Sequence, residues 1–202
     1  MTPPQALNRG LDELGLDLPQ GAEERLMRYL RLLEKWNRTY NLTAIREPVE
    51  MVSRHLLDSL AVLPHLPMPA RGALADVGAG AGLPGIPIAV ARPQWRVTLN
   101  DSNQKKAAFL RQAAIELELA NVEVHEGRVE HWRPPTRFAL VISRAFAELA
   151  RFRALCAHLA AADGVLAAMT GVAPQAQGCR VIALDVPLLG AQRHLVLCPA
   201  GN

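Results

Sequence analysis

The sequence predicts an α/β fold: a mostly parallel sheet that follows an N-terminal helical region and ends in an antiparallel edge hairpin. Three observations support this prediction. Residues 1–66 carry apolar side chains at spacings of three and four, which is the period of a helix. From residue 73 onward, short apolar segments alternate with helical patterns, as in parallel sheets covered by helices. The last two apolar segments, 181–186 and 194–197, have no helical pattern between them, so we expect them to pair antiparallel.

The helical region contains three predicted helices and ends in a proline-rich segment. A short helix over residues 7–14 ends at Gly15, and longer helical patterns cover 26–36 and 51–60. Pro64–Gly72 then holds three prolines and is the best candidate boundary. We therefore expect helices over 1–66 packed on a core over 67–202, in one structural unit.

The core is predicted from five apolar segments and the helical patterns between them. Helices are expected from about 84 to 91, over 104–119 and over 148–159. The expected parallel strands are 73–77, 96–99, 122–125, 138–142 and 165–169.

Composition limits the class of protein. The chain has 202 residues, of which 50% are apolar and 20% charged, so it is globular rather than disordered. No apolar run reaches the roughly 20 residues of a membrane span, and no signal peptide is recognisable, so we expect a cytoplasmic protein. The net charge of +3 is too small to indicate nucleic-acid binding by itself. Cys156, Cys179 and Cys198 are widely spaced, which predicts free thiols and no metal site.

A glycine-rich loop is the sharpest local signal. Glycines occupy positions 78, 80, 82 and 85, directly after the first predicted strand and before a helix that starts near Pro84. Such a loop lets the backbone approach a ligand closely. Gly80-x-Gly82-x-x-Gly85 also fits a dinucleotide fingerprint, which keeps a nicotinamide-dependent oxidoreductase open. Asp76 argues against it, because a pyrophosphate beside Asp76 would meet a like charge.

An acidic residue ends the second predicted strand. Asp101 lies 19 residues after Gly82, where a carboxylate accepts hydrogen bonds from ribose hydroxyls in this architecture. The alternative is that Asp101 or Ser102 caps the helix that follows. A glycine loop together with this acidic residue fits an adenosine ligand without phosphate.

Several motifs resemble those of one family. Asp-x-Gly-x-Gly-x-Gly from Asp76 resembles motif I of class I S-adenosylmethionine-dependent methyltransferases, which have a Rossmann-like fold. Further segments resemble the bacterial small-subunit ribosomal RNA guanine-N7 methyltransferases, also called the glucose-inhibited division protein B family. These segments are Trp36–Thr43, Arg54–Ser59, Gly82–Pro87, Asp101-Ser102 and Ile142–Ala147.

The resemblance implies a function and a set of site residues. It implies methyl transfer from S-adenosylmethionine to a guanine N7 of 16S ribosomal RNA, with the small subunit as partner; we expect a monomer. Val129 and Glu130 would flank the adenine, and Arg144 would close the site. The predicted cofactor-binding residues are Gly78, Gly80, Gly82, Leu83, Asp101, Val129, Glu130 and Arg144. Guanine N7 carries no proton, so no catalytic acid or base is predicted.

The RNA-binding candidates each have a structural alternative. Arg54 and His55 would face RNA; otherwise His55 is a buried, hydrogen-bonded histidine and Arg54 pairs with Asp58 on a helix surface. Lys105 and Lys106 would contact phosphates or lie on a solvated helix face. Phe146 would stack on a flipped base or belong to the core.

One segment departs from the family pattern. After Met169 the family typically has Lys-Gly and a helix, whereas here Thr170 replaces the lysine and the helix is missing or shortened. This departure favours an alternative function, a non-catalytic RNA- or ribosome-binding relative of the fold.

Overall fold

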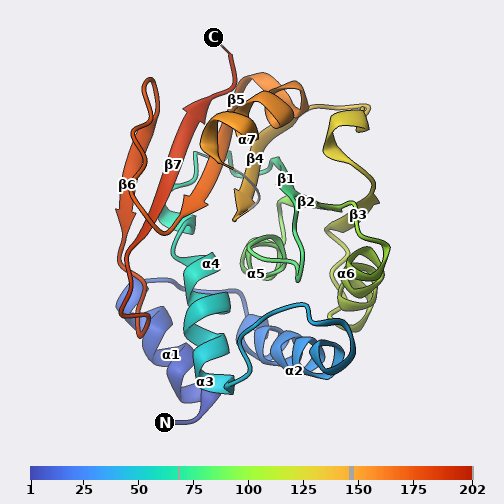
Figure 1. Ribbon diagram of the computed structural model, residues 1–202. Helices are drawn as coiled ribbons and strands as arrows, with labels where there is room; N and C mark the ends of the chain where they lie inside the picture. Colours follow the sequence, from blue (N-terminus) through green and yellow to red (C-terminus); the bar gives the residue numbers. More distant parts are fainter. Residues whose placement is uncertain (68, 146–147, 202) are drawn as a thin grey trace.

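The computed structural model describes residues 1–67, 69–145 and 148–201, and shows a seven-stranded sheet with helices on both faces (Figure 1). The strand order is β3-β2-β1-β4-β5-β7-β6. Strands β1 to β5 pair in parallel, and β7 runs antiparallel between β5 and β6. The strands are β1 (Ala73–Val77), β2 (Arg96–Asp101), β3 (Val122–Glu126), β4 (Phe138–Arg144), β5 (Ala160–Thr170), β6 (Arg180–Leu184) and β7 (Arg193–Pro199). The predicted parallel sheet and antiparallel hairpin are confirmed.

The N-terminal helices also follow the predicted periodicity. They are α1 (Pro3–Leu14), α2 (Ala22–Tyr40), and a third helix made of α3 (Pro48–Met51), η1 (Val52–Leu57) and α4 (Asp58–Leu60), followed by a 3-10 turn, η2 (Leu63–His65). Gly15 ends α1 with φ of 62°. The middle of the third helix, η1, is π-helical, which apolar spacing did not reveal. Such segments are frequent at functional sites.

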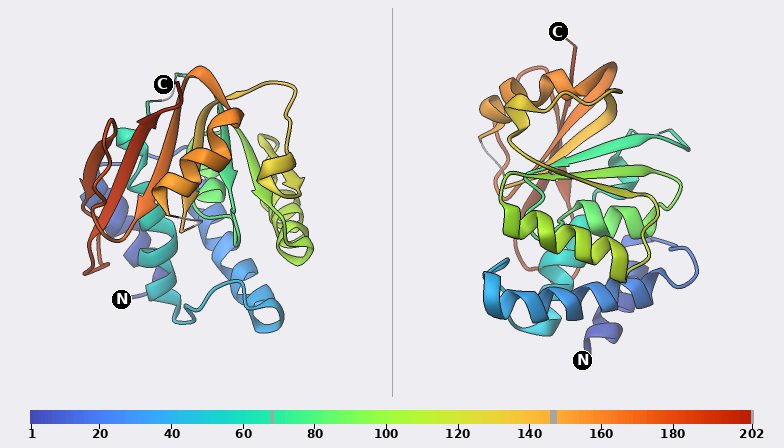
Figure 2. Two further views of the ribbon diagram at one scale, coloured as in Figure 1. Left: turned by 45° about the horizontal axis from the view of Figure 1, so that its top comes forward. Right: turned by 90° about the vertical axis from the view of Figure 1, so that its right-hand side faces the viewer.

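The elements stack in layers, as the right view of Figure 2 shows. Helix α7 (Leu149–Cys156) covers one face of the sheet, while α5 (Gly85–Ala91) and α6 (Gln104–Glu116) cover the other. Helix α2 packs against α5 and α6 from outside. Side chains of α1 and α2 belong to the same apolar cluster as Leu74 and Leu99 of the sheet. Burial of this shared apolar surface therefore holds the helical region against the core.

A few boundaries differ from the sequence prediction. Strand β5 begins at Ala160, five residues before the predicted segment. Helix α6 ends at Glu116 rather than 119, because Glu118 adopts a left-handed φ of 55°. The connection over residues 171–179 contains no helix, as the departure after Met169 predicted. Short 3-10 turns, η3 (Val129–His131) and η4 (Ala157–Leu159), complete the elements.

The prediction of three free thiols is wrong for two of the cysteines. Cys179 and Cys198 form a disulfide with a Cα–Cα distance of 4.4 Å. The hairpin register explains the pairing: Arg180 lies opposite Leu197, so the next residues outward meet. Cys156 is free and buried, and burial raises the pKa of its thiol to about 12. Within the described ranges, no helix combines the length and apolarity needed to cross a bilayer.

Candidate active site

The glycine loop lies at the carboxyl end of β1. Gly78, Gly80 and Gly82 have φ values of 68°, 59° and 87°, a region that costs residues with a Cβ about 1–2 kcal/mol each. A Cβ at Gly80 would find only the Gly78 carbonyl oxygen nearby, at 3.8 Å, so this part of the loop faces open space. A Cβ at Gly82 would instead collide with Ile86. Gly80 therefore leaves room for a ligand, whereas Gly82 is needed for packing.

Asp76 lies beneath the loop rather than beside a ligand. Its side chain is fully buried, and Oδ2 accepts a hydrogen bond of 2.8 Å from the backbone N–H of Gly85. A Cβ at Gly85 would press on this carboxylate. Burial raises the pKa of Asp76 to about 7. Asp76 lines neither of the cavities described below, so the argument that it would repel a pyrophosphate is wrong: it holds α5 against β1.

Asp101 braces the glycine loop. Its Oδ2 accepts a hydrogen bond of 2.9 Å from Gly80 N, and its Oδ1 accepts one of 2.8 Å from Asn103 N. The residue that caps α6 is Asn103, whose Oδ1 accepts from the N–H groups of Lys105 and Lys106. The expectation that Asp101 or Ser102 caps this helix is therefore wrong. Ribose binding by Asp101 stays a prediction.

Two adjoining cavities, of about 530 and 490 Å³, share Gly78, Lys106 and Ala145 and so form one elongated cleft. Each has a volume typical of small-molecule sites. We call the smaller cavity the β2–β3 half; it is lined by the end of β2, by the turn that follows β3, and by α7. The larger, the β4–β7 half, lies between the glycine loop, the third N-terminal helix and the ends of β4, β5 and β7.

The cleft gathers the predicted cofactor-binding residues except Gly82, which packs inside the loop. The β2–β3 half is lined by Gly78, Asp101, Val129 and Glu130. The β4–β7 half is lined by Gly78, Gly80, Leu83 and Arg144. Residues that are far apart in the sequence thus surround one space.

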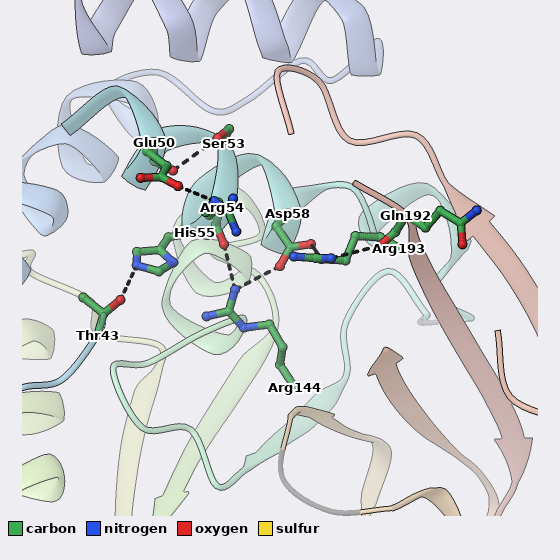
Figure 3. Close-up of polar contacts among 9 residues, drawn as sticks. All are labelled: Thr43, Glu50, Ser53, Arg54, His55, Asp58, Arg144, Gln192 and Arg193. Atoms are coloured by element: carbon green, nitrogen blue, oxygen red, sulfur yellow. Dashed lines mark hydrogen bonds and ion pairs between the residues drawn. The ribbon is translucent and has the colours of Figure 1, made fainter. Parts of the chain in front are cut away.

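A charged network forms the wall of the β4–β7 half (Figure 3). The Asp58 side chain is only 2% exposed; its Oδ2 accepts from Arg144 Nη1 at 2.9 Å, and its Oδ1 from Arg193 Nε at 3.0 Å. Arg144 Nη1 also donates to the Arg54 carbonyl oxygen at 2.9 Å. The predicted Arg54–Asp58 pair is wrong: Arg54 pairs instead with Glu50, on the exposed side of the helix. Arg193 is a cleft residue that sequence reasoning missed.

His55 lies in the same wall. It is 5% exposed, and its Nε2 shares a hydrogen bond of 2.9 Å with Thr43 Oγ1, which also accepts from Ile45 N. Burial, together with the charge of Arg144, lowers the pKa of His55 to about 4, so the imidazole is neutral at pH 7. His55 is therefore buried and hydrogen-bonded, as its structural alternative predicted; RNA binding by Arg54 and His55 stays a prediction.

Helix α2 supports the glycine loop from behind. Tyr29 is fully buried, and its hydroxyl donates a hydrogen bond of 2.7 Å to the carbonyl oxygen of Ala81. Tyr29 and Trp36 also pack on Phe109 of α6. Burial raises the pKa of Tyr29, so its phenol keeps the proton that this bond requires. The helical pattern over 26–36 covers Tyr29 but did not indicate this bond.

Comparison with known proteins identifies the family. Residues 22–180 match the family described as GidB, rRNA small subunit methyltransferase G. The chain belongs to this family. A relative from Methylobacillus flagellatus named ribosomal RNA small subunit methyltransferase G is 52% identical over 97% of this chain and 98% of its own length. One of the same name from Nitrosospira multiformis is 49% identical over 98% and 97%.

Solved structures place this member of the GidB family in the class I methyltransferase fold. A SAM-dependent methyltransferase from Aquifex aeolicus superposes with a TM-score of 0.56 at 17% identity, covering 73% of this chain and 91% of that one. A variant of MtNAS in complex with S-adenosylmethionine gives 0.57 at 15%, covering 88% and 76%. The predicted fold class is confirmed.

The basic candidates on α6 lie at two different distances from the cleft. Lys106 lines both halves, whereas Lys105 lines neither and is exposed, with its Nζ 6.0 Å from the centre of the Tyr40 ring. Phosphate binding by these lysines stays a prediction. Phe146 falls outside the described residues.

Proposed function

We propose that this chain transfers the methyl group of S-adenosylmethionine to N7 of one guanine in 16S ribosomal RNA. Membership of the GidB family supports the activity and the RNA substrate. The observation that carries the proposal is the elongated cleft, in which a glycine loop at the end of β1 lies between a half that holds Asp101, Val129 and Glu130 and a half that holds Arg144. The family assignment also disfavours the nicotinamide-dependent alternative.

The residues of the cleft fit the methyl donor. The open space at Gly80 lets the backbone lie against a ligand. The Asp101 carboxylate accepts two backbone N–H groups and still has lone pairs for ribose hydroxyls. Val129 and Glu130 would then flank the adenine. The donor's methionine end would extend past Gly78 and Leu83 toward Arg144.

The reaction requires the chain to position the two substrates and does not require it to transfer a proton. When bound, S-adenosylmethionine supplies an electrophilic methyl group on a sulfonium sulfur. The lone pair of guanine N7 forms the new N–C bond while the electrons of the C–S bond stay on sulfur, so the positive charge moves onto the purine. No proton leaves, so the reaction needs no general base. His55 in the cleft wall would be a weak base, because its pKa is lowered to about 4 and its Nε2 is bound to Thr43.

The test is incorporation of a labelled methyl group into small ribosomal subunits that lack the modification, with the product located by N7-specific strand scission. We expect label at one guanine. Label on another atom, such as an exocyclic amine, would contradict the N7 assignment. Absence of label while S-adenosylhomocysteine still binds would favour the non-catalytic relative, which the altered segment at Thr170 suggests. Sedimentation of the free chain and of its mixture with subunits would test the proposed monomer and its partner.

A further inference from the structure

The glycine loop, residues 78–83, forms one side of the cleft and has little shape of its own. Five of its six residues line the β4–β7 half, and glycines occupy every second position along it. Glycine loses more conformational freedom on folding than any other residue, so bonds from the surrounding structure must select one shape for such a loop. A ligand that lies against this backbone therefore depends on the groups that hold the loop from behind.

Two side chains hold the backbone of the loop. Asp101, at the end of β2, accepts a hydrogen bond of 2.9 Å from one of its N–H groups. Tyr29 reaches the loop from the helical region, and its hydroxyl donates a hydrogen bond of 2.7 Å to the carbonyl oxygen of Ala81. The N–H of Gly82 in turn donates to the Ala79 carbonyl oxygen at 2.7 Å. The peptide unit between Ala81 and Gly82 is therefore bonded at both ends.

This peptide unit is a point at which the loop could turn over. Rotation of a peptide unit changes ψ of the residue before it and φ of the residue after it. Glycine adopts a negative φ about as readily as a positive one, such as the 87° of Gly82. The rotated unit would lose both of its bonds and point its oxygen in another direction. The Tyr29 hydroxyl bonds only the observed orientation, so it stabilises the shape of the loop that lines the cleft.

Tyr29 is itself held in place and is separated from the cleft. Its side chain is fully buried, and its ring centre lies 6.5 Å from that of Phe109. Helix α2, which carries it, packs against α5 and α6 on the side away from the sheet (Figure 2). Tyr29 lines neither half of the cleft, so it can affect a ligand there only through the loop.

We infer that Tyr29 is a positioning residue for the methyl donor, whose hydroxyl keeps the Ala81–Gly82 peptide unit in the orientation that binds S-adenosylmethionine; this rests on the proposed function. Loss of the hydroxyl leaves the carbonyl oxygen of Ala81 without its partner and weakens the preference for this orientation. Affinity for the donor then falls with the fraction of molecules whose loop has the binding shape. Once the donor is bound, the loop has that shape, and methyl transfer proceeds at its normal rate.

The test removes one oxygen atom from helix α2 at each of two positions, since both tyrosines of the chain lie on this helix. In calorimetry, Tyr29→Phe should bind S-adenosylhomocysteine roughly 5- to 30-fold more weakly than the wild type. With small ribosomal subunits as acceptor, KM for S-adenosylmethionine should rise by a similar factor, while kcat stays within about two-fold. Tyr40→Phe is the matched control. Tyr40 is 41% exposed and its hydroxyl forms no hydrogen bond within the described residues, so this variant should bind S-adenosylhomocysteine as the wild type does.

Two further measurements separate positioning from stability. Tyr29→Phe keeps the aromatic ring and its contact with Phe109, so it should fold, with a Tm lower by about 2–4 °C; binding is measured well below this Tm. In hydrogen exchange followed by NMR, the Gly82 amide of the ligand-free variant should exchange at least about five-fold faster than that of the wild type. Saturating S-adenosylhomocysteine should remove this difference. The amide of Gly15, which caps α1, should exchange equally in both proteins.

Three results would overturn the inference. An unchanged affinity and KM in Tyr29→Phe, with a lower Tm, would mean that the hydroxyl serves stability alone. A lower kcat with unchanged affinity would place its effect after donor binding. Equal weakening in Tyr29→Phe and Tyr40→Phe would show that the bond to Ala81 is not the cause. A wild type that binds S-adenosylhomocysteine but methylates no guanine would contradict the proposed function, whereas weaker binding by Tyr29→Phe would still support the role of Tyr29.

Discussion

The glycine loop and the charged wall of the cleft, formed by Asp58, Arg144 and Arg193, are built by different physical means. The loop depends on backbone conformation: Gly78, Gly80 and Gly82 have positive φ, and the Asp101 carboxylate accepts the N–H of Gly80. The charged wall depends on side-chain charges, which come from segments 86 and 135 positions away from Asp58. The loop glycines lie within one βα unit, whereas the charged wall exists only after the whole chain has folded.

This difference predicts how the loop and the charged wall respond to substitution. A backbone site is disturbed by adding a single carbon atom, because the turn cannot accommodate a Cβ. A site built from charges tolerates a small change in side-chain volume. It is disturbed when one charged partner is removed, because the remaining charges are then partly buried without compensation.

The largest effect is expected from Gly82→Ala. The new Cβ would meet Ile86 at a φ of 87°, so we expect a loss of about 2–4 kcal/mol in unfolding free energy and at least ~100-fold weaker binding of S-adenosylhomocysteine. Urea unfolding and calorimetry measure the two quantities. Gly178→Ala has a similar φ of 74° in open space, and should cost about 1–2 kcal/mol without affecting binding. Equal affinity of the two variants for S-adenosylhomocysteine would show that the site does not depend on the backbone conformation at Gly82.

Asp58→Ala should have the next largest effect, on the charged wall. It leaves Arg144 and Arg193 facing each other without their shared carboxylate, so we expect a loss of about 2–3 kcal/mol in unfolding free energy. Glu50→Ala breaks the neighbouring pair with Arg54, whose partners are both 41% exposed, and should change stability by less than about 0.5 kcal/mol. A similar loss in the two variants would contradict the special status of Asp58.

Asp76, beneath the glycine loop, and His55, in the wall of the cleft, should also respond oppositely to pH. The pKa of Asp76 is raised from 3.8 to about 7. Between these values the folded state holds a proton that the unfolded state has released, so this group makes stability fall as pH rises. The pKa of His55 is lowered from 6.5 to about 4. There the unfolded state holds the extra proton, so His55 makes stability rise with pH.

Substitution of each group should reveal how much that group contributes to the pH dependence of stability. As the pH rises from about 4.5 to about 7.5, the free energy of unfolding of Asp76→Asn should increase by about 2 kcal/mol relative to that of the wild type. Over the same range, the free energy of unfolding of His55→Gln should decrease by a similar amount relative to the wild type. Urea unfolding at several pH values measures both. A difference that does not vary with pH would show that the substituted group keeps its ordinary pKa in the folded protein.

The smallest effect is expected at the rim of the cleft. Replacing Lys105 and Lys106 with alanine together should weaken binding of small-subunit RNA several-fold and reduce the salt dependence by about one to two phosphate contacts. Filter binding at a series of salt concentrations measures both quantities, with Arg9→Ala as control. Unchanged affinity and salt dependence would remove both lysines from the RNA-binding surface.

The sequence predicts the glycine loop far better than the charged wall. Apolar periodicity predicts the order of helices and strands, and glycine spacing locates the loop, because both signals are local. Asp101 is also correctly placed at the end of its strand. Val129, Glu130 and Arg144 were identified only through family resemblance, since a turn residue and a residue at a strand end carry no distinctive local pattern.

What the sequence analysis missed depends on tertiary register. Asp58 looked like a surface partner of Arg54 because its true partners lie on β4 and β7. The disulfide follows from the register of the β6–β7 hairpin. The separate pairing of β7 with β5 places His194 opposite Thr170, which brings the neighbouring Arg193 to the cleft. Equal distances of Cys179 and Cys198 from the hairpin turn were the available signal. The bond from Tyr29 to Ala81 had none, because it joins two elements that only packing brings together.

The bond between Tyr29 and Ala81 makes the outer helix a structural part of the glycine loop. Helix α2 lies outside the sheet, yet its tyrosine hydroxyl is the donor that satisfies the buried carbonyl oxygen of Ala81 in the loop. A replacement of α2 that lacked this hydroxyl would leave that carbonyl oxygen without its partner, which is costly inside a protein. The glycine loop of this chain therefore cannot be transplanted without the helix behind it.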